Sequence, residues 1–118
     1  MDRVIELGRL FDYYGAFLTA RQRALVDAYA NENLTLGELA EREGISRQGV
    51  RDGIVRAERQ LREMERRLGL IRRTERLGAE LAALRGAAQA LPQGLAQRAA
   101  LLTGLDRAAA ILEEEDGV

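Results

Sequence analysis

Cysteine, histidine and lysine are all absent from this sequence of 118 residues, and serine occurs once, at Ser46. Without the first two, the chain has no disulfide, no thiolate or imidazole metal ligand, and no general base that titrates near neutral pH. Nucleophilic catalysis of the Ser–His, Cys–His or Schiff-base kind is likewise excluded. The Asp and Glu residues show no spacing typical of a catalytic pair. We therefore expect a protein that is not an enzyme and that carries no metal and no cofactor.

Long apolar runs and proline are also scarce. No run of about 18 apolar residues is present, and the first six residues include three charges, where a signal peptide would be apolar. We therefore expect a cytoplasmic protein that does not bind membranes. Pro92 is the only proline, and apolar residues recur at helical rather than alternating spacing, which predicts an all-α fold.

The rare hydroxyl side chains mark expected helix starts. Thr19 and Thr35 are each followed three residues later by Gln or Glu, which is the capping-box pattern, and Ser46 and Thr74 stand at similar junctions. Together with the apolar periodicity, they predict a first helix that ends near residue 15, a second over about 20–31 and a third over about 36–43. A long fourth helix then spans 46–68 and ends at Gly69.

The chain is long enough for one modest core with an appendage. We expect a helix-turn-helix domain over residues 1–73, which includes the long helix 46–68, and a helical tail over residues 74–118. Apolar residues resume a helical pattern after Thr74, and Pro92-Gln-Gly94 interrupts it. This predicts a C-terminal helical hairpin that finishes in a frayed acidic end at residues 113–116.

Positive charge is concentrated in the middle of the chain. Residues 46–73 carry nine arginines against four acids, whereas the segments before and after them are both net negative. Such a basic segment is typical of a nucleic-acid contact, although an Arg/Glu-rich solvated helix gives a similar count.

The segment from Leu36 to Ile54 has the spacing of a helix-turn-helix. Ala40 would let the two helices approach, Gly44 would make the turn, and Ile45 would fill the angle between them. The first turns of the second helix would then point outward into a major groove. The predicted nucleic-acid-binding residues are Ser46, Arg47, Gln48, Arg51, Asp52 and Arg56.

These residues suggest particular contacts. Arg47 and Arg51 could fork onto guanine or clamp phosphate, and Gln48 could pair with adenine. Asp52 would be repelled by the backbone or would orient an arginine. Gly49 and Gly53 each disfavour a helix by roughly 1 kcal/mol relative to alanine, so the second helix could be soft before a ligand docks.

A heptad pattern runs along the long helix with alternating spacings of four and three. It has two equal interpretations, a helix packed within the chain against the tail or an interface with a partner helix or a second copy. The residues that we assign to a partner or oligomer interface are Val50, Ile54, Leu61, Met64, Leu68 and Ile71.

Five separated motifs, in order and spacing, resemble the bacterial YlxM-like family of helix-turn-helix proteins. They are Leu10-Phe-Asp-Tyr-Tyr-Gly15, Leu18-Thr-Ala-Arg-Gln22, Leu36-Gly-Glu-Leu-Ala40, Gly44-Ile-Ser-Arg-Gln48, and the helix from Arg56-Ala-Glu58 to Leu68-Gly-Leu70. The resemblance covers residues 1–73, and the sequence departs from the family pattern at Gly49 and Gly53. It implies a helix-turn-helix similar to the promoter-reading domain of sigma factors, with no enzymatic activity and no cofactor.

The resemblance also implies a regulatory or accessory role in the signal recognition particle pathway. Duplex DNA is then the expected partner, with RNA as an alternative because the particle contains RNA. A second interpretation is a protein-interaction module that docks the particle's targeting GTPase or forms a homodimer, with the helix-turn-helix as scaffold.

Overall fold

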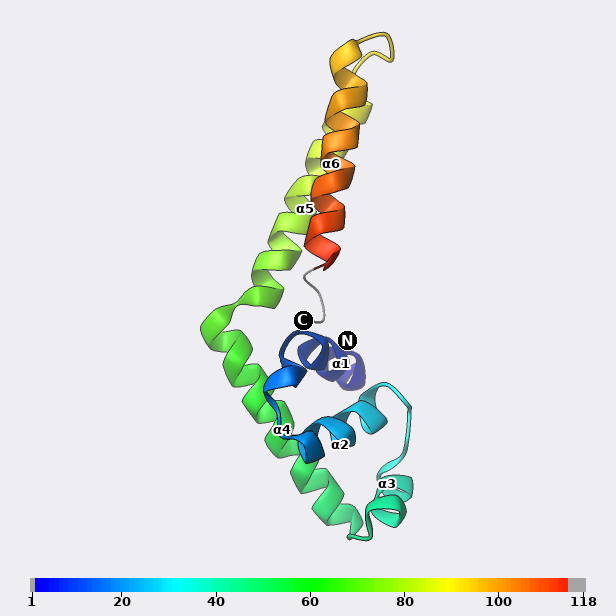
Figure 1. Cartoon of the computed structure of the whole chain (residues 1–118), viewed down its shortest axis with the longest axis vertical. Coiled ribbons are helices and arrows are strands. Elements are labelled where there is room, and N and C mark those ends of the chain that lie inside the picture. The colour runs from blue at the N-terminus through cyan, green and yellow to red at the C-terminus, as the bar shows by residue number, and fades with distance from the viewer. Residues whose placement is uncertain (1, 115–118) are drawn as a thin grey trace. The chain divides into compact units, whose positions relative to one another are not determined.

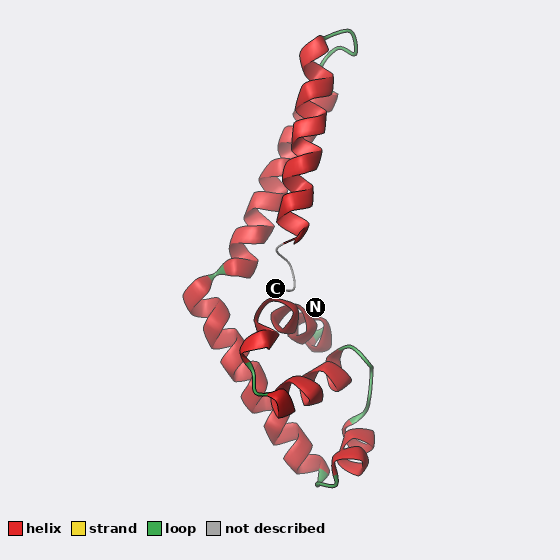
Figure 2. Ribbon diagram, viewed as in Figure 1, coloured by secondary structure: helices red, strands yellow, loops and turns green. Residues whose placement is uncertain are grey.

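The computed structural model describes residues 2–114 and is all-helical over that range, as predicted (Figure 2). The elements in chain order are α1 (Arg3–Tyr14), a 3₁₀ turn η1 (Gly15–Phe17), α2 (Ala20–Ala30), α3 (Leu36–Glu43), α4 (Arg47–Leu68), α5 (Leu70–Gln89) and α6 (Ala96–Glu114), labelled in Figure 1. The described chain divides into two compact units, one over residues 2–69 and the other over residues 70–114.

Side-chain caps define most of the helix starts. Thr19 and Thr35 each form the predicted capping box at the start of α2 and α3, and Ser46 Oγ accepts a hydrogen bond from the backbone N–H of Gly49 at 3.0 Å. Asp2 caps α1 in the same way. The predicted cap at Thr74 is wrong, because α5 already begins at Leu70. Gly69 ends α4 in a left-handed conformation with φ 63°, and the chain re-enters a helix in the next residue.

The first unit packs α1, α2 and α3 against α4. Each of these helices places apolar side chains on the face turned toward the others, which is the arrangement that an amphipathic stripe requires. The side chains buried in this core are those of Leu7, Leu10, Tyr14, Leu18, Leu25, Val26, Ala28, Leu39, Val50, Ile54, Ala57 and Leu61.

The heptad pattern of α4 serves this core. Val50, Ile54 and Leu61 are buried against the unit's own helices, so their assignment to a partner or oligomer interface is wrong. The other interpretation, a helix packed within the chain, named the tail as its partner, whereas α4 packs on α1, α2 and α3. Met64 is half-buried, Leu68 is 52 % exposed, and Ile71 lies beyond the end of α4, in α5.

An ion-pair network joins α1 to α4. Glu58 is the one buried charged residue of the described chain, and it accepts hydrogen bonds from Arg3 at 2.8 Å and Arg62 at 3.0 Å. Arg62 also contacts Glu6 at 3.3 Å. Burial alone raises the pKa of Glu58, but the hydrogen bonds and charges of Arg3 and Arg62 hold that pKa below its ordinary value.

This lowered pKa makes the first unit sensitive to acid. The stabilisation from Glu58 is fully present above its ordinary pKa of 4.5 and is lost as the pH falls through the lower pKa of the folded state. We expect Glu58→Gln to melt below the wild type at neutral pH, and the gap to narrow between about pH 5 and pH 3. Circular-dichroism melting of both proteins across this range measures the gap. A gap that stays constant with pH would contradict a charge-dependent role of Glu58.

The second unit is an antiparallel hairpin of α5 and α6, which lie side by side in Figure 1. Residues 90–95, which include Pro92 and Gly94, connect the two helices, as predicted. Glu113 and Glu114 belong to α6 rather than to a frayed end. The rest of the predicted acidic end, residues 115 and 116, lies outside the described residues.

Candidate nucleic-acid interface

The turn between α3 and α4 is built from three consecutive residues. Gly44 adopts a left-handed conformation with φ 68°, which glycine reaches without the strain that a Cβ would bring. Its N–H and that of Ile45 both point back to the carbonyl of Ala40, and Ser46 then caps α4. This geometry ends one helix and starts the next within three residues, as a helix-turn-helix requires.

Ile45 does less at this turn than predicted. It is 36 % exposed, so it fills the angle between the two helices only in part. Its Cδ1 instead lies 3.6 Å from where a Cβ on Gly49 would be, over the first turn of α4. Leu39 supplies the buried anchor of α3 and is fully inaccessible to solvent.

All six predicted nucleic-acid-binding residues are exposed. They extend from the N-cap of α4 through its N-terminal half, and they are Ser46, Arg47, Gln48, Arg51, Asp52 and Arg56. Exposure makes them available to a ligand, but their role as contacts is a prediction that the fold leaves untested.

Two of these side chains are oriented by neighbours. A Cβ added at Gly37 would lie 3.1 Å from Nη2 of Arg47, so the Arg47 guanidinium packs against the backbone of α3. Gln48 Nε2 donates a hydrogen bond to Oδ1 of Asp52 at 2.9 Å. Asp52 therefore orients a glutamine, not an arginine as one interpretation of the sequence suggested.

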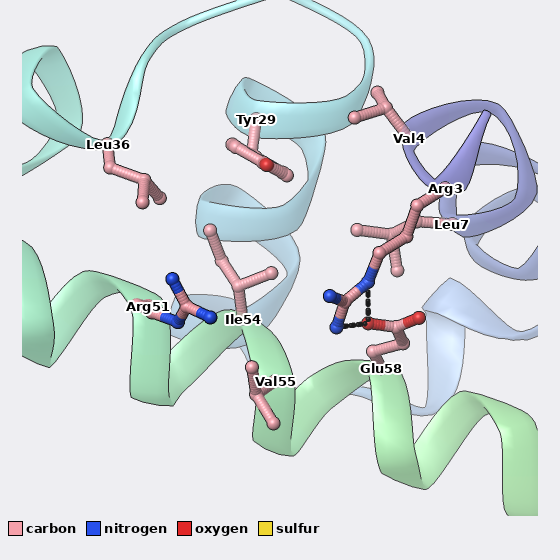
Figure 3. Close-up of a pocket in the computed structure, with 9 residues that line it drawn as sticks. All are labelled: Arg3, Val4, Leu7, Tyr29, Leu36, Arg51, Ile54, Val55 and Glu58. Carbon is pink, nitrogen blue, oxygen red and sulfur yellow. Dashed lines mark hydrogen bonds and ion pairs between the residues drawn. The ribbon is translucent and has the colours of Figure 1, made fainter.

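Arg51 lies at the edge of a small cavity between the helices of the first unit (Figure 3). The cavity has a volume of about 110 Å³, and Figure 3 shows Arg51 beside Ile54 while the Arg3–Glu58 pair forms another part of the wall. No sequence pattern predicted this cavity, or the packing of Arg47 against Gly37. A glycine in the first turn of a capped helix was the only available hint.

The arginines of α4 fall into two groups along the helix. Toward the C-terminus, Arg62 pairs with Glu58 and Glu6, and Arg66 and Arg67 both pair with Glu63 at 2.6 and 2.8 Å. The hydrogen bonds from Arg66 and Arg67 lower the pKa of Glu63 to about 2. Within residues 2–114, the arginines nearer the N-terminus form no ion pair, and these unpaired arginines are Arg47, Arg51, Arg56 and Arg59.

This division concentrates available positive charge at the helix-turn-helix. The unpaired arginines add to the partial positive charge of the α4 N-terminus, where backbone N–H groups point outward. The paired arginines further along are largely neutralised by neighbouring carboxylates. The N-terminal half of α4 is therefore the part of this helix best suited to bind a polyanion.

Other kinds of site find little support in the described part of the chain. Residues 2–114 contain no group of three or more acidic side chains placed to hold a metal ion. Over the same residues, every helix is too short or too polar to cross a membrane.

Comparison with known proteins gives a consistent match. A family model described as "Putative helix-turn-helix protein, YlxM / p13 like" matches residues 1–92. The UPF0122 protein of Acetivibrio thermocellus is 49 % identical over 71 residues, which are 60 % of this chain and 61 % of that protein. The matched region thus spans about three fifths of that relative's length.

Two further relatives share the same name. The UPF0122 protein of Symbiobacterium thermophilum is 43 % identical over 76 residues, covering 64 % of this chain and 71 % of that protein. The one from Shouchella clausii is 39 % identical over 87 residues, covering 74 % and 80 %. No solved structure matches the chain. The chain belongs to the UPF0122 family of YlxM / p13-like helix-turn-helix proteins.

Proposed function

We propose that the protein binds duplex DNA through the N-terminal half of α4 and acts in the cytoplasm as a regulatory or accessory protein, without enzymatic activity. The observation that supports this proposal most is the placement of the unpaired arginines. Three of them, Arg47, Arg51 and Arg56, are exposed in the N-terminal half of the second helix of a helix-turn-helix, and Arg59 follows just past its midpoint. The arginines further along α4 are paired with carboxylates. The second helix is the element that enters the major groove in proteins of this architecture.

Some side chains at the start of α4 would position the protein on the DNA backbone, and others would contact the bases. Arg47 and Arg51 would grip phosphates or fork onto guanine. Gln48 gives one amide hydrogen to Asp52, and keeps its other amide hydrogen and its carbonyl oxygen. Those two groups match the N7 acceptor and N6 donor of adenine, so Asp52 would hold Gln48 in a reading orientation.

The proposed pathway rests on the family resemblance. We propose that the DNA-binding activity serves the signal recognition particle pathway, as the YlxM-like motifs of residues 1–73 imply. Two other partners are alternatives to DNA, one that would bind the same arginines and one that would bind elsewhere. RNA would meet the same arginines through its phosphates, and the particle's targeting GTPase would dock on a face outside the helix-turn-helix.

A salt titration distinguishes these partners. We expect binding to mixed-sequence duplex DNA to involve about four phosphates, so the affinity should fall about a hundredfold between 50 and 200 mM salt. The same titration is run with signal-recognition-particle RNA and with the GTPase. If only the RNA binds, and binds in a salt-sensitive way, the ligand of the arginines is RNA and the proposed binding to DNA is wrong. Binding to the GTPase alone, with little change across this salt range, would overturn the nucleic-acid function.

A further inference from the structure

The hairpin of α5 and α6 has one apolar side and one polar side. The residues of α5 that face α6 include Gly78, where an added Cβ would lie 3.8 Å from Cδ2 of Leu112, and Arg85, which pairs with Asp106. Continuing this register at spacings of three and four places Leu81 and Ala88 of α5, and Leu105 and Ala109 of α6, on the inner faces.

The flanks of this inner face differ in chemistry. Each heptad has two inner positions, which are three residues apart. In an antiparallel helix pair, the residues that directly precede the first inner position lie on one side of the pair, and the residues that directly follow the second inner position lie on the other side. The first side, which we call the leucine side, contains Leu70, Leu77, Leu84, Leu101 and Ala108. The opposite side contains Glu75, Ala82, Gln89, Ala99, Asp106 and Glu113.

The leucine side remains open to solvent. Leu77, Leu84 and Leu101 are 48, 54 and 49 % exposed, and Ile111 one turn beyond Ala108 is also exposed. Between them, α5 and α6 bury a single side chain, that of Ala88. Two helices with so little burial lack the core that helical stability in proteins rests on, which further helices would supply.

The pattern of the leucine side specifies a helical occupant. Leu70, Leu77 and Leu84 recur every seven residues, which is the period that keeps a stripe facing another helix along its length. The charges beside this stripe are self-complementary. Arg73 and Glu80 lie on the outer edge of the leucine side, four residues before and three after Leu77.

A two-fold axis near Leu77 would therefore pair these charges between copies. With two α5 helices antiparallel, Arg73 of each copy meets Glu80 of the other.

The area of the leucine side is also sufficient for a specific interface. A face about 30 Å long and two helices wide, each about 10 Å, buries about 1,200 Å² in total, which reaches the size of specific interfaces.

We propose that the leucine side of the hairpin binds a second copy of this chain, with the two α5 helices antiparallel about Leu77, to form a four-helix bundle. Four helices enclose the leucines in a core that two leave open. This interface is separate from the heptad pattern of α4 and from the arginines of the helix-turn-helix, so it does not depend on the proposed DNA binding.

The mass of the full chain in solution tests the interface. Light scattering during size-exclusion chromatography should give twice the chain mass of 13.1 kDa for the wild type. Leu77→Glu/Leu84→Glu should raise the dimer dissociation constant about a hundredfold or more. The matched control Ala79→Glu/Ala82→Glu adds the same charge to the opposite side of α5 and should stay dimeric. A monomeric wild type, or a double leucine variant that stays dimeric, would overturn the proposal.

A charge exchange tests the antiparallel register, and it keeps the leucines intact should the leucine variant fail to fold. Arg73→Glu and Glu80→Arg should each weaken the dimer about fivefold, because each places two like-charge pairs across the axis. The combined exchange should restore the wild-type dissociation constant. Single variants that leave the dimer unchanged, or a combined variant that is weaker than either one, would overturn the proposed arrangement.

Discussion

Arg47→Ala/Arg51→Ala is expected to weaken binding to mixed duplex DNA by about ten- to a hundredfold, and to lower the slope of log affinity against log salt by about two. Both side chains are exposed and unpaired, so their removal takes two positive charges from the proposed phosphate contacts and leaves no carboxylate without a partner. Fluorescence anisotropy at several salt concentrations measures the affinity and the slope together.

The matched control is Arg66→Ala/Arg67→Ala. It removes the same net charge from the same helix, but these two arginines are engaged by Glu63 in the folded protein. We expect its affinity to change by less than about threefold and its salt slope to stay close to that of the wild type. Equal losses in the two variants would mean that net charge, rather than contact by the start of α4, determines binding.

The sequence predicted local structure well wherever neighbours along the chain determine it. The capping boxes at Thr19 and Thr35 and the glycine turn at Gly44 depend on residues within four positions, and all three were confirmed. Thr74 failed because Gly69 interrupts the helices for a single residue. A chain that re-enters a helix at Leu70 needs no hydroxyl cap four residues later.

What a heptad stripe packs against could not be predicted in the same way. Val50, Ile54 and Leu61 have the spacing of a coiled coil, and a core with three other helices produces the same spacing. Only the tertiary arrangement shows that α1, α2 and α3 already occupy that face. The same limit applies to the arginines, because Arg62 is paired partly by Glu6, which lies 56 positions earlier in the chain.

The glycines of α4 show a further limit. From propensity alone, Gly53 predicts a soft helix, but α4 is continuous through it, and a Cβ there would lie 3.0 Å from Cδ2 of Leu25. The position therefore serves the close approach of α2 to α4, a reason that a single sequence does not reveal. Gly49 similarly lies beneath Ser46 and Ile45 at the start of the helix.

Leu39→Ala is expected to lower the free energy of unfolding of the first unit by about 2–5 kcal/mol, the range for a fully buried leucine. Leu39 is the only buried residue of α3, a helix of eight residues. A helix this short is unstable alone, even with its capping box, so its place beside α4 depends mainly on the packing of Leu39. Urea unfolding followed by circular dichroism measures the loss.

Leu39→Ala should also weaken DNA binding, although Leu39 is buried and is not one of the proposed contacts. The guanidinium of Arg47 packs against α3 at Gly37, so a loosened α3 would leave the Arg47 side chain less ordered before binding. Ordering that side chain on the DNA would then cost free energy and lower the affinity. The control is Leu36→Ala, which shortens a half-buried leucine of the same helix and should cost about half as much stability. We expect DNA affinity to fall for Leu39→Ala under conditions where the variant is still folded, and to change little for Leu36→Ala. If Leu39→Ala binds DNA as tightly as the wild type, α4 acts alone and the first helix of the motif only completes the core.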